Sequence, residues 1–235
     1  MTSESAQPVG PLVAAGPAKR PERVTLRGRW ITLVPLNADA HAADLFEGAN
    51  GGEKDRVWTY LFDGPYTDPE VFKANIAAKA ASSDPLFWAI IDNSSGRAVG
   101  YQTFLRIEPT HRVIEVGNIL YTPAMQRTPG ATEAQYLFAR HVFDDLGNRR
   151  YEWKCNALNA PSRRAAERFG FTFEGVFRQH MIVKGRNRDT AWFSTLDTEW
   201  PSRRRAFEAW LDPSNFDANG AQKRALFDLM KEIAS

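Results

Sequence analysis

The chain has 235 residues, of which 43% are hydrophobic and 25% are charged. This composition is typical of a folded globular protein and excludes a wholly disordered, collagen-like or coiled-coil chain. The 30 Lys and Arg residues nearly balance the 28 Asp and Glu residues, which argues against the broad basic surface of a nucleic-acid-binding protein. We therefore predict no nucleic-acid partner.

The positions of apolar and turn residues predict the secondary structure. In chain order, the expected elements are strands over residues 24–26 and 30–36, helices over 38–49 and 69–79, strands over 87–92, 98–107 and 113–121, a helix over 134–146, a strand over 150–155, a helix over 161–169, strands over 171–177 and 190–196, and helices over 202–211 and 218–233. This order predicts a mixed α/β fold, a mostly antiparallel central sheet flanked by helices.

The composition also divides the chain into three parts. Residues 1–20 are rich in Ser, Ala, Pro and Gly, and we expect a flexible tail there. A folded domain is predicted over 21–200, followed by a helical extension over 201–235. The apolar residues of the extension either cap the core or form a dimer contact, so the sequence leaves monomer and homodimer open.

Targeting and redox signals favour the cytoplasm. No apolar run approaches the roughly 18 residues of a membrane span, and the start of the chain lacks the apolar centre of a signal peptide. Cys155 is the single cysteine, which excludes an intramolecular disulfide framework and a multi-cysteine zinc site. The four histidines have no metal-ligand spacing. We expect a cytoplasmic protein without a metal and without a membrane partner.

An aromatic-rich segment over residues 56–66 has weak periodicity. Its rings either fill the core or form a wall that faces a substrate, because loops on a rigid scaffold often carry binding residues. Trp58 and Tyr60 are the candidates for such a wall.

The loop over residues 126–132 is the most informative stretch. Small residues between a strand and a helix start leave backbone N–H groups that can point at an anion, and the helix dipole assists. Arg127 would add a positive charge, and the hydroxyls of Thr128 and Thr132 would donate hydrogen bonds. The alternative is an ordinary N-cap and tight turn.

A second motif follows at the end of the next strand, where Asn159-Ala160-Pro161-Ser162 begins a short helix and Gly170-Phe171-Thr172-Phe173-Glu174-Gly175 ends it. Together with the loop, this motif resembles the GNAT superfamily of acyl-CoA-dependent N-acyltransferases, in the subgroup that acetylates the N-termini of ribosomal proteins. The resemblance covers residues 24–200 and makes 21–200 an N-acyltransferase domain.

The resemblance implies acetyl-CoA as the acyl donor, with the pantetheine arm paired along the strand before the loop and the pyrophosphate held by the loop. The residues implied in cofactor binding are Ile119, Leu120, Tyr121, Gln126, Arg127, Thr128, Gly130, Ala131, Thr132, Glu133, Asn159, Ser162 and Arg163. The loop departs from the superfamily pattern, since Pro129 has no N–H to give and Thr132 stands where Gly or Ala is usual. Hydroxyls of Thr128 or Thr132 would compensate.

The implied reaction needs a neutral amine, a stabilised oxyanion and a proton for the departing thiolate. Ser162 matches the position at which the subgroup places a hydroxyl near the CoA sulfur, so it is the candidate acid. The alternative is a serine that merely caps its helix. Asn159 has the same two interpretations, as a cofactor ligand or a cap.

Glu115 stands in the middle of the strand over 113–121, where an unpaired buried charge is costly. We hypothesise that it removes the amine proton and contacts the substrate. The alternative is an exposed residue paired across the sheet with an Arg or Lys. Gly117 would permit a bulge, and N–H groups near residues 118–120 would stabilise the oxyanion. Cys155 is interpreted as a buried, inert thiol rather than a nucleophile.

The predicted function is acetyl transfer to a primary amine, either a peptide or protein N-terminus or a small amine, by direct attack in a ternary complex. Two alternatives remain. One is a regulatory module that binds acyl-CoA without turnover, because a fold does not guarantee chemistry. The other is acetylation of an amine-bearing antibiotic or an aminoacyl nucleotide, whose base would stack on Trp58 and Tyr60.

Overall fold

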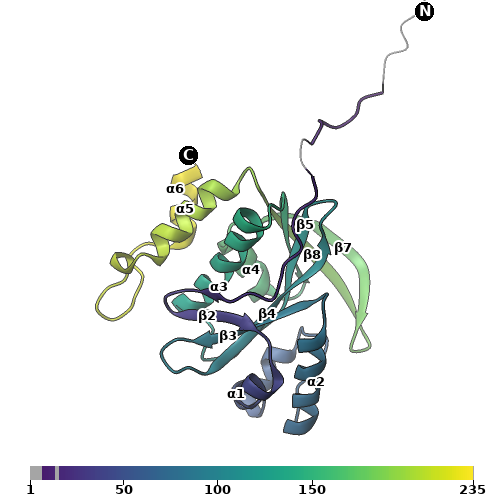
Figure 1. Cartoon of the computed structure of the whole chain (residues 1–235), viewed down its shortest axis with the longest axis vertical. Coiled ribbons are helices and arrows are strands. Elements are labelled where there is room, and N and C mark those ends of the chain that lie inside the picture. The colour runs from purple at the N-terminus through teal and green to yellow at the C-terminus, as the bar shows by residue number, and fades with distance from the viewer. Residues whose placement is uncertain (1–6, 14–15, 235) are drawn as a thin grey trace, which may run out of the picture.

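The computed structural model describes residues 7–13 and 16–234, and in this part of the chain one eight-stranded sheet runs through the molecule (Figure 1). The strand order is β1-β2-β3-β4-β5-β6-β8-β7. The strands are β1 (Leu26–Arg27), β2 (Ile31–Pro35), β3 (Leu86–Asp92), β4 (Ala98–Glu108), β5 (Val113–Tyr121), β6 (Arg150–Asn156), β7 (Thr172–Val183) and β8 (Arg186–Leu196). The predicted strands are thus all present, and β7 and β8 are longer than predicted.

Neighbouring strands are antiparallel with one exception among the described residues, the parallel pair β5 and β6. A parallel pair needs a crossover, which the intervening helix α3 supplies. The mixed, mostly antiparallel fold predicted from the sequence is confirmed, and the strand, helix, strand unit lies near the centre of the sheet.

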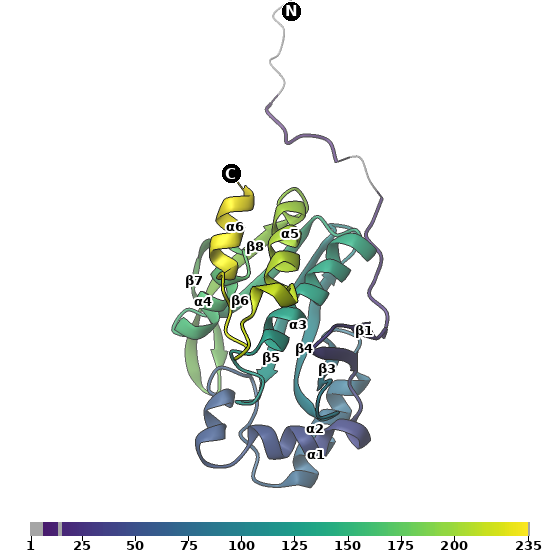
Figure 2. The ribbon, with the colours of Figure 1, turned by 90° about the vertical axis from the view of Figure 1, so that its left-hand side faces the viewer.

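Helices cover both faces of the sheet (Figures 1 and 2). They are α1 (Ala38–Ala49), the 3-10 helix η1 (Gly52–Trp58), α2 (Pro69–Ala81), α3 (Pro129–Arg140) with its π-helical continuation η2 (His141–Asp145), α4 (Ala160–Arg168), α5 (Trp200–Leu211), the 3-10 helix η3 (Pro213–Asn215) and α6 (Leu226–Ala234). Side chains cap several starts: Asn37 accepts the Ala40 N–H, and Asp68 accepts the N–H groups of Glu70 and Val71, which follow Pro69.

The hydrophobic core has two parts, one on each face of the sheet. The larger cluster joins α3, α4, α5 and α6 to the sheet and includes Phe104, Phe138 and Trp200. The smaller cluster joins α1, η1 and α2 to the other face and includes Leu45 and Phe72. The helices before β3 and those after β5 therefore stabilise opposite faces.

The C-terminal helices pack on the core of the chain itself. Phe207 and Trp210 of α5 and Leu229 of α6 belong to the larger cluster, so these helices cap the core. Two helix starts were predicted wrongly, because α6 begins at Leu226 instead of residue 218 and α3 begins at Pro129 instead of residue 134. The preceding residues form a loop closed by a bridge between Phe216 and Gln222.

The tail predicted over residues 1–20 falls partly outside the described residues, at 1–6 and 14–15. Its last residues are tied to the fold, since Ala18 N–H donates to the carbonyl of Pro109 and Lys19 N–H to that of Leu146. The domain boundaries and the cytoplasmic location stay predictions. Over the described ranges, no helix has the length and apolar character that a membrane crossing requires.

Candidate functional site

The central feature of the candidate site is the point where β5 and β6 stop pairing. Their parallel register ends at Val116 and Trp153, although β5 continues to Tyr121 and β6 to Asn156. Helix α3 follows the end of β5 and α4 follows the end of β6, so the positive ends of two helix dipoles lie at this edge. The separation leaves one edge of β5 without a strand partner in the described chain.

A β-bulge lies in the unpaired half of β5. Gln102 of β4 is opposite two residues of β5, Asn118 and Ile119, because the register passes from Thr103–Gly117 to Tyr101–Leu120. Asn118 has a φ of +44°, a left-handed conformation that Asn tolerates better than most residues. The bulge predicted beside Gly117 is therefore present, with Asn118 as its left-handed residue.

The loop before α3 uses its own side chains to close the turn. The Thr128 hydroxyl donates to the carbonyl of Met125 at 2.8 Å and accepts from the Ala131 N–H at 3.2 Å. Gln126 donates from Nε2 to the carbonyl of Tyr121 at 2.9 Å. Arg127 is exposed and left-handed, with a φ of +62°. The N-cap interpretation holds for Thr128, whose hydroxyl proton is already donated within the loop.

The side chains of two residues in the first turns of α3 bond to other parts of the protein. Thr132 is buried, and its hydroxyl accepts from Arg168 Nη1 at 3.0 Å. The Glu133 carboxylate accepts the backbone N–H groups of Arg29, Trp30 and Ile31 at 2.7 to 3.0 Å. This carboxylate closes the turn between β1 and β2, so the expectation that the side chains of Thr132 and Glu133 contact the pyrophosphate is not supported.

The same helix start borders a separate cavity. It has a volume of about 550 Å³ and reaches from the end of α1 to Thr128, Pro129 and Gly130 at the start of α3. Its polar side chains include Asp44 and Arg97, which pair with each other at 2.9 Å. The first turn of α3 is therefore accessible from the side of β3 and β4.

The start of α4 places Ser162 against β6. Asn159 caps the helix, since its Oδ1 accepts the Ser162 N–H at 3.2 Å. The Trp153 indole N–H donates to Ser162 Oγ at 3.0 Å. An indole nitrogen only donates, so the serine oxygen is the acceptor and its own O–H proton can be donated to a neighbour, which in this structure is the thiol of Cys155. The capping role of Asn159 leaves its side-chain N–H₂ for a further contact.

Cys155 lies beside Ser162 and is buried. Burial raises the pKa of its thiol, and a hydrogen bond from Ser162 together with the charges of Arg188 and Arg163 only partly opposes this effect. The thiol form is therefore favoured at neutral pH, as expected for an inert cysteine.

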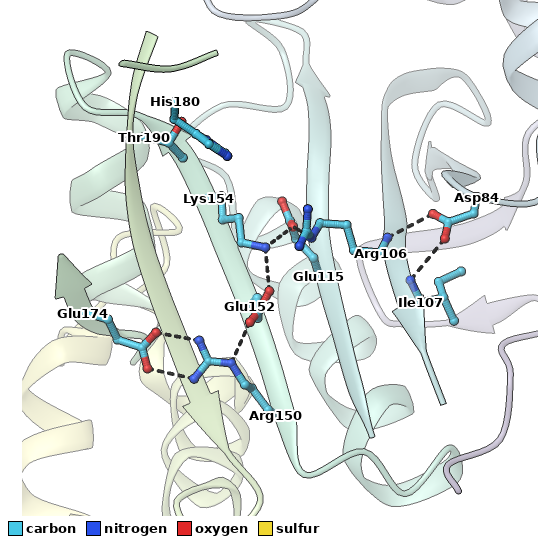
Figure 3. Close-up of polar contacts among 10 residues, drawn as sticks. All are labelled: Asp84, Arg106, Ile107, Glu115, Arg150, Glu152, Lys154, Glu174, His180 and Thr190. Carbon is cyan, nitrogen blue, oxygen red and sulfur yellow. Dashed lines mark hydrogen bonds and ion pairs between the residues drawn. The ribbon is translucent and has the colours of Figure 1, made fainter. Parts of the chain in front are cut away.

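A row of alternating charges crosses the face of the sheet opposite α3 (Figure 3). Lys154 Nζ donates to Glu115 Oε2 at 2.7 Å and to Glu152 Oε2 at 2.6 Å. Arg150 bonds Glu152 at 2.6 Å and continues to Glu174 on β7 at 2.8 Å. We call these five residues the charged row.

Glu115 is the end of the row that lies nearest the separation of β5 and β6. Its side chain is 7% exposed, and Arg106 Nε lies 3.6 Å from the oxygen that Lys154 contacts. The other oxygen, Oε1, accepts no hydrogen bond from the residues that the structure describes. The expected cationic partner is present, but Glu115 is buried rather than exposed.

Burial affects the pKa values of Glu115 and Glu152, the two carboxylates that Lys154 contacts, differently. It raises the pKa of Glu115 above the ordinary value, and the charge and hydrogen bond of Lys154 offset this only in part. Burial opposes ionisation of Glu152 as well, but hydrogen bonds from both Lys154 and Arg150 hold the pKa of that carboxyl below its ordinary value. Glu115 is thus the better proton acceptor.

The aromatic segment divides between core and surface. Trp58 is 1% exposed, its indole donates to the carbonyl of Ala49 at 2.7 Å, and it packs edge-on to Tyr66 and Phe72. The prediction that Trp58 faces a substrate is wrong, because the ring completes the smaller core cluster. Tyr60 is half-buried.

Tyr60 and the hairpin of β7 and β8 hold the aromatic segment over the site. The Tyr60 hydroxyl donates to the carbonyl of Leu158, just before α4, at 3.1 Å. Lys184, at the tip of the hairpin, donates to the carbonyls of Trp58 at 2.9 Å and Gly64 at 3.0 Å. The segment is therefore fixed to both sides of the site.

The sequence comparisons place the chain in a family. Residues 31–172 match the model of the acetyltransferase (GNAT) domain. The chain belongs to the GNAT acetyltransferase family. A search of curated proteins finds no significant match to this acetyltransferase.

Solved structures agree with this assignment. A GCN5-related N-acetyltransferase from Brucella melitensis is 50% identical, with a TM-score of 0.91 and coverage of 93% of this chain and 99% of that one. A probable acetyltransferase of the GNAT family from Chromobacterium violaceum is 40% identical, with a TM-score of 0.77 and coverage of 85% and 100%. The fold is also similar to that of the Microcin C7 self immunity acetyltransferase MccE, solved in complex with acetyl-CoA and AMP, at 20% identity, a TM-score of 0.63 and coverage of 72% and 93%.

Three site residues of this acetyltransferase were missed by sequence reasoning. Trp153 orients Ser162, Lys154 neutralises Glu115, and Arg188 of β8 lies buried on the face of the charged row. The spacing of Trp153 and Lys154 relative to Asn159 gives no signal by itself. Arg188 stands in a basic run over residues 184–188 that is typical of a solvated surface.

Proposed function

We propose that this acetyltransferase moves the acetyl group of acetyl-CoA to a primary amine by direct attack in a ternary complex. The observation that carries the proposal is the end of the β5 and β6 pairing, with Glu115 on one strand and Ser162 at the helix that follows the other. The similarity to acetyltransferases of the same family supports acetyl transfer, and MccE was solved with acetyl-CoA.

The unpaired edge of β5 is suited to the pantetheine arm. An extended chain with amide groups can add to such an edge like a strand, which involves Ile119, Leu120 and Tyr121. The pyrophosphate would lie at the start of α3, held by backbone N–H groups and by the exposed Arg127. Since Thr128 and Thr132 bond within the protein, the backbone carries this contact. Asn159 and Arg163 at the start of α4 are further candidates.

The reaction uses one group from each side of the point where β5 and β6 separate, Glu115 on β5 and Ser162 after β6. The amine nitrogen attacks the thioester carbonyl, and Glu115 Oε1 accepts the proton that the nitrogen loses. Backbone N–H groups at the bulge over residues 118–120 stabilise the oxyanion. When the carbon–sulfur bond breaks, Ser162 gives its hydroxyl proton to the thiolate and regains one from solvent. The products are an amide and CoA with a free thiol.

The proposed donor is a single compound, acetyl-CoA, whereas the proposed acceptor is a whole class, the primary amines. The resemblance to the enzymes that acetylate the N-termini of ribosomal proteins keeps a peptide or protein N-terminus among the candidate acceptors, together with small amines. The aminoacyl-nucleotide alternative loses one of its two supporting rings, because Trp58 is in the core. Tyr60 remains, as a half-buried ring whose hydroxyl donates to the carbonyl of Leu158.

The test is release of free thiol from acetyl-CoA in the presence of a panel of N-terminal peptides, amino acids, aminoacyl nucleotides, polyamines and aminoglycosides. We expect release that depends on the amine. Calorimetric binding of acetyl-CoA without release from any amine would contradict the proposal and favour a module that binds acyl-CoA without turnover.

A further inference from the structure

Arg188 is a buried cation without a partner. The residue is 8% exposed, and its guanidinium makes no hydrogen bond or ion pair with the residues that the structure describes. Its Nε is fully enclosed and has no acceptor. The guanidinium lies over the ring of Phe62, with Cζ 5.4 Å from the ring centroid.

This arrangement is costly for a structural residue. A guanidinium does not lose its proton at accessible pH, so it cannot escape burial by becoming neutral. A buried charge is costly to the fold unless it is paired. Arg150, in the charged row, shows the usual solution, since it contacts both Glu152 and Glu174. Arg188 has the same chemistry without the anions.

The register places Arg188 on the face of the charged row. Lys154 lies opposite Trp192, and Asn156 lies opposite Thr190. Since side chains alternate along a strand, Arg188, two residues before Thr190, faces the same side. The Trp192 indole N–H on this face is also buried without an acceptor. Two donors of β8 therefore face the site with nothing to bind.

The site chemistry lies close to this guanidinium. Arg188 interacts electrostatically with the Glu115 carboxylate. The guanidinium therefore lies on the face of the sheet that carries Glu115, within electrostatic range of the proposed base. The segment that carries Phe62 is anchored to the hairpin through Lys184, which donates to the carbonyls of Trp58 and Gly64.

We propose that Arg188 binds an anionic group of the acceptor, a carboxylate or a phosphate, attached within a few atoms of the amine that is acetylated. A guanidinium fork matches both anions with two parallel hydrogen bonds. The inference rests on the proposed function and narrows its acceptor class. Amino acids, aminoalkyl phosphates and similar molecules are favoured over polyamines and neutral amines.

The test uses matched pairs of amines that differ only in the anion. Glycine is compared with glycinamide, and O-phosphoethanolamine with ethanolamine, in the thiol-release assay with acetyl-CoA. For at least one pair, we expect kcat/KM of the wild-type enzyme to be about tenfold or more higher for the anionic member, as a charged hydrogen bond would give. The pair that shows the preference distinguishes carboxylate from phosphate.

Variants assign the preference to the guanidinium. Arg188→Gln should bring the ratio within each pair close to one and leave KM for acetyl-CoA unchanged, whereas Arg188→Lys should keep part of the preference. Arg186→Gln removes an exposed charge from the same strand and should change neither. A raised KM for acetyl-CoA in Arg188→Gln, without a change in acceptor preference, would show that the anion belongs to the cofactor and overturn the inference.

Thiol release and calorimetric binding together distinguish a failure of this inference from a failure of the proposed function. If neutral amines alone support thiol release, the proposed function stands and the role of Arg188 is wrong. If no amine supports release, the proposed function fails, and calorimetry with the CoA-loaded protein decides about Arg188. Binding of an anionic amine to the wild type and not to Arg188→Gln would support the inference, and equal binding or none would overturn it.

Discussion

The two ends of the charged face differ in how completely their polar groups are paired. At one end, Arg150, Glu152 and Glu174 each contact at least one opposite charge, and Glu174 also accepts from Ser194. At the other end, Glu115 keeps one oxygen without a protein donor and Arg188 has no acceptor. The first end follows the rule for buried charges in a stable fold, and the second departs from it.

The difference distinguishes polar groups that stabilise the fold from polar groups that can bind a ligand or transfer a proton. A saturated network holds strands together but has no group left to bind a ligand. Groups that are buried and incompletely paired cost stability and persist where a substrate or a proton transfer compensates. The unsaturated end coincides with the separation of β5 and β6, which supports placing the reaction there. Substitutions at the two ends should therefore have different effects.

The largest expected effect is on Glu115, at the unsaturated end. Glu115→Gln removes the proton acceptor, and kcat/KM should fall by about 10²-fold or more at neutral pH. Because burial raises the pKa of Glu115 above 4.5, protonation should inactivate the wild type as the pH falls through that raised pKa. The acid limb of the wild-type pH profile should be absent from the variant. An unchanged rate and profile would exclude Glu115 as the base.

Ser162→Ala tests the other side of the separation. The hydroxyl accepts from Trp153 and directs its proton to the neutral thiol of Cys155, a weak acceptor that a CoA thiolate would replace. Its loss should lower kcat by about 10²-fold if it protonates the thiolate. Affinity for acetyl-CoA, measured by calorimetry, should change little. A serine that only caps α4 would instead show normal turnover and a lower unfolding temperature.

Glu152→Gln tests the saturated end and is the matched control for Glu115→Gln. It should cost about 1–3 kcal/mol of stability, because it leaves Lys154 and Arg150 with a weaker acceptor. Turnover per folded molecule should stay within a few-fold of wild type. A rate loss as large as that of Glu115→Gln, without destabilisation, would contradict the division into two ends.

The lowered pKa of Glu152 also predicts how the stability of the protein depends on pH. Lys154 and Arg150 hold the pKa of Glu152 below 4.5 in the folded state. Its stabilisation is therefore present above pH 4.5 and is lost as the pH falls through the lowered pKa. Chemical denaturation as a function of pH should show a smaller acid loss in Glu152→Gln than in wild type.

The smallest expected effect is at the loop before α3. Thr128→Ala removes an N-cap and should cost about 1 kcal/mol of stability. Since the hydroxyl bonds to Met125 and Ala131, KM for acetyl-CoA should change less than twofold. A large rise in that KM would return Thr128 to the pyrophosphate contacts.

Local patterns predicted most of the elements and part of the site. Asp68 with Pro69 marked the start of α2, and Asn159 marked the start of α4, because a capping side chain acts on N–H groups of its own segment. The bulge beside Gly117 and the cationic partner of Glu115 were also anticipated. Each of these features depends on residues near in sequence or on neighbouring strands.

Contacts between distant segments were not accessible in this way. Trp58 is in the core because α2 and the end of α1 meet around it. The local sequence of residues 56–66 contains no sign of this contact. Glu133 was assigned to the loop after β5, but its carboxylate binds the turn between β1 and β2, more than 100 residues away.

The sequence by itself therefore determined the order of strands and helices, the family and the position of the candidate acid, since periodicity, caps and motifs are local properties. The tertiary structure decided which polar groups remain unpaired. Arg188 in the sequence is one of several basic residues of a hairpin, and only the packing of Phe62 and β8 against the charged face makes it a buried cation. Pairing and burial are properties of groups brought together by folding, and they decide where binding and catalysis are possible.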